Sequence, residues 1–245
     1  MTTGSAETAG RLLPLLDLTS LKDGRDDDIA ALCAKAVTRH GKVAAVCSWP
    51  DFTADMKRRL EGSGVAVAVV INFPAGTEAP DAVLAETEAA RAAGAEELDL
   101  VMPYRGWLSG ERAAARELIA AVKAAAGSAS LKVILETGAF EDPRQVAEAG
   151  RDAIDAGADF LKTSSGKIPV GATPAAAEAL LGVIKDTGGR VGFKASGGIR
   201  SLEEARTYLD IAEGILGADW VTPAHFRIGA SKLLDAVLAE LDAGR

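Results

Sequence analysis

Residues 65–71 read Val-Ala-Val-Ala-Val-Val-Ile, an unbroken apolar run in which no polar residue alternates with the apolar ones. A strand of this kind leaves no face for water, so it suits a parallel sheet that is covered on both sides. From Asp26 onward, short apolar runs of this type alternate with longer helical patterns. This alternation predicts parallel strands joined by helical crossovers.

Eight apolar runs are candidates for these strands. The weakest spans residues 12–18, because Pro14 interrupts it. The other seven are 43–47, 65–71, 97–101, 131–135, 160–162, 191–194 and 218–221. Strand pattern alone fits both a closed barrel and an open doubly wound sheet.

The intervening segments carry helix signals. Apolar residues recur at helical spacing within 26–39, behind a run of three aspartates. Three further helices are expected to begin at Asp142-Pro143, at Thr173-Pro174 and at Ser201, where Glu204 completes a capping box. No linker or low-complexity tract divides the 245 residues, so we expect one domain, residues 1–245.

Composition narrows the class of partner. A formal net charge of -8 disfavours nucleic acid and anionic membranes, because both bind basic surfaces. Residues 1–10 lack the features of a signal peptide, and no apolar run is long enough to span a membrane, so we expect a cytoplasmic protein. The two cysteines form no C-x-x-C pair, and the two histidines show no metal-binding spacing. We therefore expect reduced thiols and no metal.

Polar residues at strand ends are the candidates for chemistry, because reactive groups in such folds lie at the carboxyl ends of strands. Two of them are lysines, Lys162 and Lys194, which end successive runs, and Asp99 lies between leucines near the end of a third. A neighbouring cation and apolar walls lower the pKa of a lysine and make it nucleophilic. The full set of polar residues at strand ends is Asp17, Cys47, Asn72, Asp99, Glu136, Lys162, Lys194 and Thr222.

Two glycine-containing segments, 196–198 and 228–231, are expected to follow the last two strands. Barrels of this type often bind phosphate at this position, through backbone N–H groups and a helix N-terminus. Lys167 and Arg200 could add positive charge. Cys47 is interpreted as a buried small side chain, and His225, placed after the last predicted strand, receives no role.

Four segments together resemble the deoxyribose-phosphate aldolases, and the resemblance extends over nearly the whole chain. They are LDLTSL at 16–21, LDLVMPYR at 98–105, FLKTSSGK at 160–167, and 192–200, which begins GFK and ends GIR. The resemblance implies a TIM (β/α)8 barrel, here with a short N-terminal extension, and reversible cleavage of 2-deoxy-D-ribose 5-phosphate to acetaldehyde and D-glyceraldehyde 3-phosphate. It also implies no cofactor, and a homo-oligomer such as a dimer.

The resemblance further assigns roles. It implies that Lys162 forms the Schiff base, that Lys194 perturbs the pKa of Lys162, and that Asp99 relays protons with a water molecule. It implies that Asp17 and Thr19 orient the lysine pair. The residues that it places around the phosphate are Gly166, Lys167, Gly197, Gly198, Gly229 and Ser231.

The sequence departs from the family at two places. Lys232 stands where similar proteins often carry a second serine, and the chain ends at Arg245 without the tyrosine-terminated tail of some members. We therefore assume no proton transfer from such a tyrosine. Two alternatives stay open: another Schiff-base aldolase of phosphorylated sugars, and a non-catalytic barrel that binds a phosphosugar. A metal-dependent aldolase fits least, given the histidine count.

Overall fold

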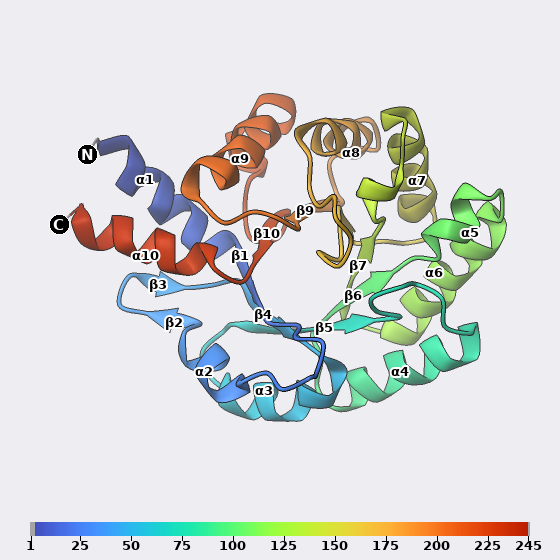
Figure 1. The fold of residues 1–245 in the computed structure, drawn as a ribbon, viewed down its shortest axis with the longest axis horizontal. Helices are drawn as coiled ribbons and strands as arrows, with labels where there is room; N and C mark the ends of the chain where they lie inside the picture. The colour runs from blue at the N-terminus through green and yellow to red at the C-terminus, as the bar shows by residue number, and fades with distance from the viewer. Residues whose placement is uncertain (1–2, 245) are drawn as a thin grey trace.

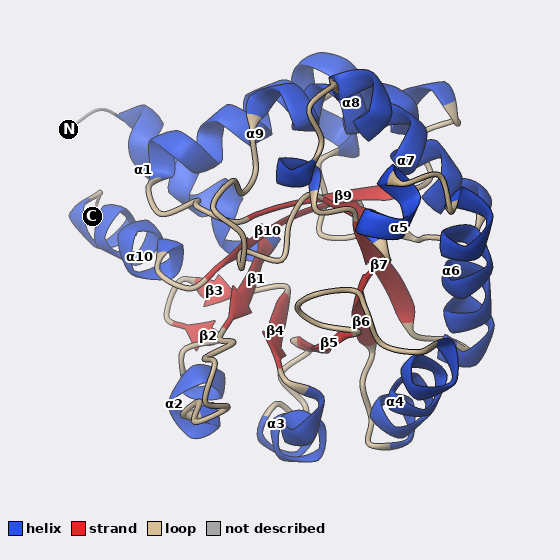
Figure 2. Cartoon of the chain, turned by 45° about the vertical axis from the view of Figure 1, so that its right-hand side comes forward, coloured by secondary structure: helices blue, strands red, loops and turns tan. Residues whose placement is uncertain are grey.

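Eight parallel strands close into a barrel in the computed structural model, which describes residues 3–244. Helices surround the barrel on the outside (Figures 1 and 2). The barrel strands are β1 (Leu16–Thr19), β4 (Ala45–Ser48), β5 (Ala66–Ile71), β6 (Glu97–Val101), β7 (Ser130–Ile134), β8 (Phe160–Lys162), β9 (Gly192–Ser196) and β10 (Phe226–Ala230). Each pairs in parallel with the next, and β1 closes the ring by pairing with both β4 and β10. The expected TIM barrel is confirmed.

Three helices begin where the sequence places them. Asp142, Thr173 and Ser201 cap their helices through side-chain oxygens, and Ser201 and Glu204 form the expected capping box. The α-helices are α1 (Thr3–Leu12), α2 (Ile29–Ala34), α3 (Thr53–Arg59), α4 (Pro80–Ala92), α5 (Tyr104–Leu108), α6 (Arg112–Ala126), α7 (Pro143–Asp155), α8 (Pro174–Asp186), α9 (Leu202–Leu216) and α10 (Leu233–Ala243). The 3-10 turns are η1 (Leu13–Leu15), η2 (Pro50–Phe52), η3 (Thr137–Ala139) and η4 (Ala218–Trp220).

The strand expected at 218–221 is wrong. Residues Ala218–Trp220 form the turn η4. The last strand, β10 (Phe226–Ala230), begins eight residues after the start of the expected strand. Gly217, with φ of 92°, ends α9, and the Val221 N–H donates to the Ala218 carbonyl oxygen at 3.1 Å, which closes these residues into a 3-10 turn instead of an extended strand. The observed strand has the sequence FRIGA. Because an arginine and a glycine interrupt its apolar residues, it lacks the apolar run that predicts a strand.

Two expectations near the N-terminus are only partly right. Of the run 12–18, residues 13–15 form η1 and the strand begins at Leu16. The helix expected within 26–39 is limited to Ile29–Ala34, and a small antiparallel hairpin follows it, formed by β2 (Val37–Thr38) and β3 (Gly41–Lys42). The N-terminal extension forms α1, which packs beside α10, so both ends of the described chain lie on the same side (Figure 1). Met1 and Thr2 lie outside the described residues.

Strand β5 explains why the run at 65–71 is apolar throughout. Val67, Val69 and Ile71 pack in the large core between the barrel and its helices. Ala68 and Val70 belong to a second, smaller apolar cluster with Ala45 and Cys47 of β4. Both faces of the strand are therefore buried, as expected for a parallel sheet covered by helices. The single-domain expectation for residues 1–245 stays a prediction.

Strand register places basic residues side by side on three consecutive strands. Lys162 on β8 pairs with Lys194 on β9, and Lys194 pairs with Arg227 on β10. On the other side of β8, Asp99 of β6 pairs with Lys132 of β7. Register partners in a sheet point to the same face, so these side chains meet in the barrel interior. The barrel thereby gathers a set of charges that are far apart in the chain.

Candidate active site

A pocket of about 380 Å³ opens at the carboxyl ends of β1, β8, β9 and β10. Its walls are the loops that follow these strands, and Lys162, the last residue of β8, reaches into it. TIM barrels carry their reactive groups at this face. The residues proposed from the sequence that line the pocket are Thr19, Lys162, Gly166, Lys167, Gly197, Gly198, Gly229 and Ser231.

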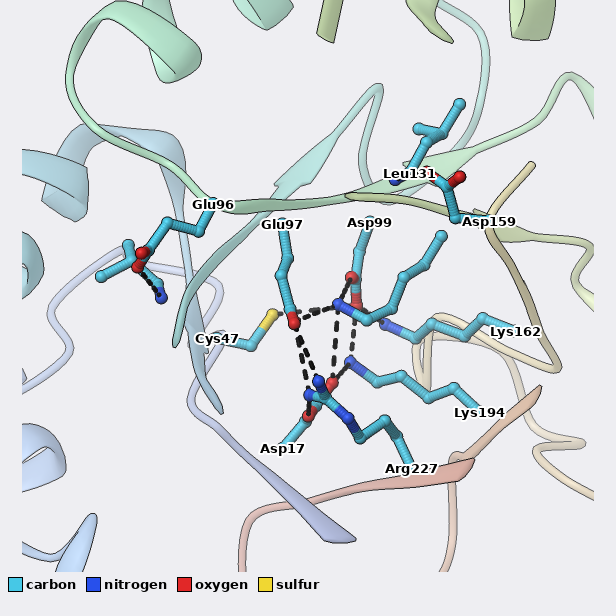
Figure 3. Close-up of polar contacts among 12 residues, drawn as sticks. Asp17, Cys47, Glu96, Glu97, Asp99, Leu131, Asp159, Lys162, Lys194 and Arg227 are labelled. Atoms are coloured by element: carbon cyan, nitrogen blue, oxygen red, sulfur yellow. Dashed lines mark hydrogen bonds and ion pairs between the residues drawn. The ribbon is translucent and has the colours of Figure 1, made fainter. Parts of the chain in front are cut away.

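Lys162 and Lys194 share one carboxylate oxygen. The Nζ atom of Lys162 lies 2.7 Å from Oδ2 of Asp99, and the Nζ atom of Lys194 lies 2.7 Å from the same oxygen (Figure 3). The two lysines differ in access, because Lys162 lines the pocket while Lys194 and Asp99 have no exposed surface. Of the two amines, Lys162 is the one that a molecule in the pocket can touch.

The surroundings also shift the two lysines in opposite directions. Burial lowers the pKa of Lys162; the carboxylate of Asp99 opposes this shift, and the ammonium of Lys194 adds to it. Burial also acts to lower the pKa of Lys194, but Asp17 and Asp99 outweigh it, so that pKa is raised. Lys194 therefore keeps its proton at neutral pH, and Lys162 is the amine that more readily becomes neutral. The neutral amine is the form that attacks a carbonyl carbon.

Beneath the pocket, six charged side chains form a closed ring in which cations and anions alternate. We refer to it as the charge ring (Figure 3). Each member contacts the next: Nη1 of Arg227 lies 2.6 Å from Asp17, Asp17 lies 2.5 Å from Lys194, and Lys194 lies 2.7 Å from Asp99. In order, the charge ring runs through Arg227, Asp17, Lys194, Asp99, Lys132 and Glu97.

The second half of the charge ring closes through Lys132. Its Nζ atom lies 3.2 Å from Oδ1 of Asp99 and is also paired with Glu97. Glu97 closes the ring, because its Oε1 atom lies 2.9 Å from Nη2 of Arg227. Burial acts to raise the pKa of Asp99, but the three surrounding lysines outweigh it and hold that pKa well below its usual range. The members therefore stabilise each other's charged forms.

Sequence reasoning missed three members of the charge ring: Glu97, Lys132 and Arg227. Glu97 and Lys132 lie inside runs recognised as strands, and Arg227 lies in the strand that was misplaced. A charged residue within an apolar strand was the available signal, because a lysine is almost never fully buried without a partner or a function. Lys132 has no exposed surface at all.

The rim of the pocket holds the residues expected around a phosphate. Gly166, Gly197 and Gly198 have φ of 77°, 92° and 90°, which side chains rarely adopt, and a Cβ on Gly197 would come within 2.9 Å of the Gly171 backbone. Lys167 donates from Nζ to the Leu21 carbonyl oxygen at 2.8 Å and pairs with Asp23. Its ammonium is thereby held over the loop after β1.

Further positive charge and polar groups line the same rim. Lys22 and Arg200 both border the pocket, and Lys22 was not singled out from the sequence. Ser231 lies just after β10, two residues before α10 begins. Gly229 was expected in a turn, but it lies inside β10, in register with Asp17 and Ser196. The pocket thus combines Lys162 at its floor with cationic loops at its rim.

The remaining candidates have other surroundings. Asp17 is fully buried beneath the pocket, and the Thr19 hydroxyl donates to the Asp17 carbonyl oxygen at 2.9 Å. Cys47 is buried with Sγ 3.9 Å from Asp99, and burial raises the pKa of its thiol to about 11. Glu136 follows β7 with both φ and ψ in the left-handed region and accepts from the Ser165 N–H at 3.1 Å.

Two candidates lie at the other end of the barrel, because the last strand was misplaced. Thr222 and His225 precede β10 instead of following a strand. The ring of His225 stacks on Trp220 at 5.5 Å between centroids. The amide of Asn72, after β5, donates to the Val101 carbonyl oxygen and so fixes a loop.

Among residues 3–244, no group of three or more histidine, cysteine, aspartate and glutamate side chains lies close enough to hold a metal ion. Within the same residues, no helix has the length and apolar character needed to cross a membrane.

The closed barrel, the lysine pair and the cationic rim are the features of a TIM-barrel enzyme whose site lies at the carboxyl face of its strands. Residues 13–238 match the family model described as DeoC/LacD family aldolase. The chain belongs to this family of aldolases, and the resemblance seen in the sequence is confirmed.

Individual relatives agree with this assignment. The chain is 46% identical over 241 residues to the deoxyribose-phosphate aldolase of Agrobacterium fabrum, covering 97% of this chain and 93% of that protein. Among solved structures, the deoxyribose phosphate aldolase of Aeropyrum pernix, which is tetrameric, matches at 29% identity with a TM-score of 0.75, covering 98% of this chain and 91% of that one. A Toxoplasma gondii protein matches with a TM-score of 0.90 over 99% and 97% of the two chains, but at 24% identity it supports the fold alone.

Proposed function

We propose that this aldolase reversibly cleaves 2-deoxy-D-ribose 5-phosphate to acetaldehyde and D-glyceraldehyde 3-phosphate, with Lys162 as the Schiff-base lysine. The observation that carries the proposal is that Lys162 lines the pocket while it shares a carboxylate oxygen with the fully buried Lys194. The 46% identity to a deoxyribose-phosphate aldolase over nearly the full chain supports the choice of substrate.

The chemistry follows from the amine. Neutral Lys162 attacks the C1 aldehyde of the open-chain sugar to form a carbinolamine, and protonation of its hydroxyl followed by loss of water leaves an iminium ion. When a base removes the proton of the C3 hydroxyl, the C2–C3 bond breaks, and its electron pair moves into the iminium to give an enamine. The C3 fragment leaves as the aldehyde of glyceraldehyde 3-phosphate. Protonation of the enamine at C2 and hydrolysis of the resulting iminium release acetaldehyde and restore the lysine.

Asp99 and Lys194 support this cycle from below the pocket floor. The Oδ2 atom of Asp99 contacts both amines at 2.7 Å, so it can exchange protons with Lys162 and, through a water molecule, with the substrate. Lys194 keeps its positive charge next to Lys162 and thereby disfavours a second ammonium there. Asp17 holds Lys194 in place from the other side.

The phosphate of the substrate would bind at the pocket rim. Backbone N–H groups around Gly197, Gly198 and Ser231, with the ammonium of Lys167, offer the donors and the charge that an anion needs. Gly166 and Gly229 line the same pocket and leave room for the chain of the sugar. Binding of the phosphate there would place C1 near Lys162, so it would contribute to rate as well as to affinity.

A trapping experiment tests the activity class and the nucleophile together. Incubation with acetaldehyde and borohydride, followed by peptide mapping, should place one reduced adduct on Lys162. Parallel assays should detect glyceraldehyde 3-phosphate from 2-deoxyribose 5-phosphate. Trapping without cleavage of this sugar would favour another Schiff-base aldolase, and absence of any adduct would favour a non-catalytic phosphosugar-binding barrel.

Other properties are proposals of the same kind. We infer that the enzyme needs no cofactor or metal, works in the cytoplasm and forms a homo-oligomer such as a dimer. The Aeropyrum pernix relative is tetrameric, so light scattering on the purified protein should distinguish a dimer from a tetramer.

A further inference from the structure

The charge ring is balanced without Lys162. Its three cations are Arg227, Lys194 and Lys132, and its three anions are Asp17, Asp99 and Glu97. Within residues 3–244, the one ion pair of Lys162 is with Asp99, which already has two other lysines beside it, so Lys162 is attached to the outside of this ring. With Lys162 protonated, the buried cluster carries one excess positive charge; with Lys162 neutral, it carries none.

Burial makes the net charge of this cluster energetically important. All six members of the charge ring are at most 7% exposed, and four of them have no exposed surface. Charges in such an interior interact more strongly than in water, and an uncompensated buried charge is costly. The group that can most easily remove the excess charge is the one with the fewest opposing partners and a path to solvent, and Lys162 meets both conditions.

Arg227 and Glu97 contribute opposite charges to the charge ring, and neither residue lines the pocket. Arg227 contacts Asp17 and Glu97, so its charge offsets two of the three carboxylates. Glu97 contacts Lys132 and Arg227, so its charge offsets two of the three ring cations. Both act on Lys162 through Asp17, Lys132 and the carboxylate of Asp99.

Building on the proposed function, we propose that Arg227 and Glu97 are positioning residues whose opposite charges, closed into the ring, set the pH at which Lys162 becomes a neutral nucleophile. Removing the Arg227 guanidinium leaves three carboxylates and two cations in the ring, so the ring would favour the protonated form of Lys162. Removing the anion leaves an excess of positive charge, so the ring would expel that proton more readily.

The other titratable groups around Lys162 do not account for such a pair of opposite effects. Asp99 on β6 and Lys194 on β9 are unchanged in both variants. The Cys47 thiol on β4 stays neutral below its raised pKa of about 11. Burial raises the pKa of Glu136, the buried carboxyl after β7 that interacts electrostatically with Lys162, and neither substitution touches it.

The test uses the full-length protein and three variants: Arg227→Met, Glu97→Gln and the double variant. The amount of borohydride-trapped acetaldehyde on Lys162 is measured by peptide mapping as a function of pH, together with the pH profile of kcat/KM. We expect the pH midpoint of adduct formation on Lys162 to move up by about one pH unit in Arg227→Met and down by about one pH unit in Glu97→Gln. The double variant removes one positive and one negative charge, so the ring is again balanced and its midpoint should lie close to that of the wild-type protein.

Arg206→Met is the matched control, because it removes an arginine that is paired with Asp210 on the exposed face of α9. Its midpoint should not move. If Arg227→Met does not fold, Glu97→Gln and the double variant still test the sign, since the second substitution should reverse the first. Equal midpoints in all variants, or shifts in the same direction, would overturn the role of the ring while leaving Lys162 as the nucleophile. No adduct on Lys162 of the wild-type protein would instead refute the proposed function itself.

Discussion

Gly229 leaves the space that the side chain of Lys194 occupies: a Cβ atom at position 229 would lie 2.9 Å from Cε of Lys194. Such a contact is too close, and Lys194 cannot easily move, because Asp17 and Asp99 hold its ammonium at 2.5 Å and 2.7 Å. Gly229 therefore makes room for Lys194 and also lines the pocket. Strand β10 needs a residue without a side chain at this point.

Gly229→Ala should consequently displace Lys194 and lower kcat by about 100-fold, the scale expected for a shift of about 1 Å in a catalytic group. Trapping with acetaldehyde, which carries no phosphate, should fall as well. Gly182→Ala is the control, since a Cβ at that position in α8 meets nothing within 4 Å. Normal acetaldehyde trapping in Gly229→Ala would show that the glycine serves the phosphate alone.

Lys194→Leu tests the electrostatic effect of one lysine on the other. Because Lys194 contributes to the lowered pKa of Lys162, its removal should raise that pKa toward the ordinary value. The neutral amine is then populated only at higher pH, so the alkaline requirement of kcat/KM should move upward and trapping should survive at high pH. Lys162→Leu should abolish turnover and trapping at every pH. Adducts mapped to Lys194 in the wild-type protein would reverse the two roles.

Ser231→Asp should place a carboxylate at the rim where the phosphate is expected to bind. Like-charge repulsion should lower kcat/KM for 2-deoxyribose 5-phosphate by about 100-fold, and kcat/KM for unphosphorylated deoxyribose should change little. Ser128→Asp adds the same charge at an exposed turn between α6 and β7, and should have no effect. An unaltered preference for the phosphorylated sugar in Ser231→Asp would place the phosphate elsewhere.

Lys132→Met should destabilise the fold, because it leaves Glu97 and Asp99 in the interior without one of their cations. Loss of one partner of a buried ion pair typically costs about 3–5 kcal/mol. Lys35→Met removes an exposed lysine 3.7 Å from Asp235, and such pairs contribute at most about 1 kcal/mol. Urea unfolding of both variants gives the comparison, and equal midpoints would mean that the charge ring does not stabilise the fold.

Dialysis against a chelator should leave turnover unchanged, because the proposed iminium supplies the electron sink that a metal would otherwise supply. Steady-state rates before and after dialysis measure this directly. A loss of activity that added zinc specifically restores would contradict the Schiff-base mechanism.

The sequence by itself determined a parallel sheet covered on both faces and two lysines at its carboxyl edge, and the resemblance to the aldolases selected a closed barrel over an open sheet. Apolar runs without alternation indicated parallel strands buried on both faces, as at Val67 and Ala68, and lysines at or near the ends of two successive strands were expected to face one pocket. The resemblance to the aldolases then ranked Lys162 above Lys194. Local pattern was sufficient here because strand burial and strand ends are properties of neighbouring residues.

Only the tertiary structure decided how the charges are shared. Arg227 and Glu97 are 130 residues apart in the chain, and strand closure brings them within 2.9 Å. Whether Lys162 or Lys194 reaches the pocket depends on the direction of each side chain inside the barrel, which spacing along the chain does not specify. The pKa values diverge for the same reason: an electrostatic interaction depends on distance through space and on burial, and both are set when the barrel closes.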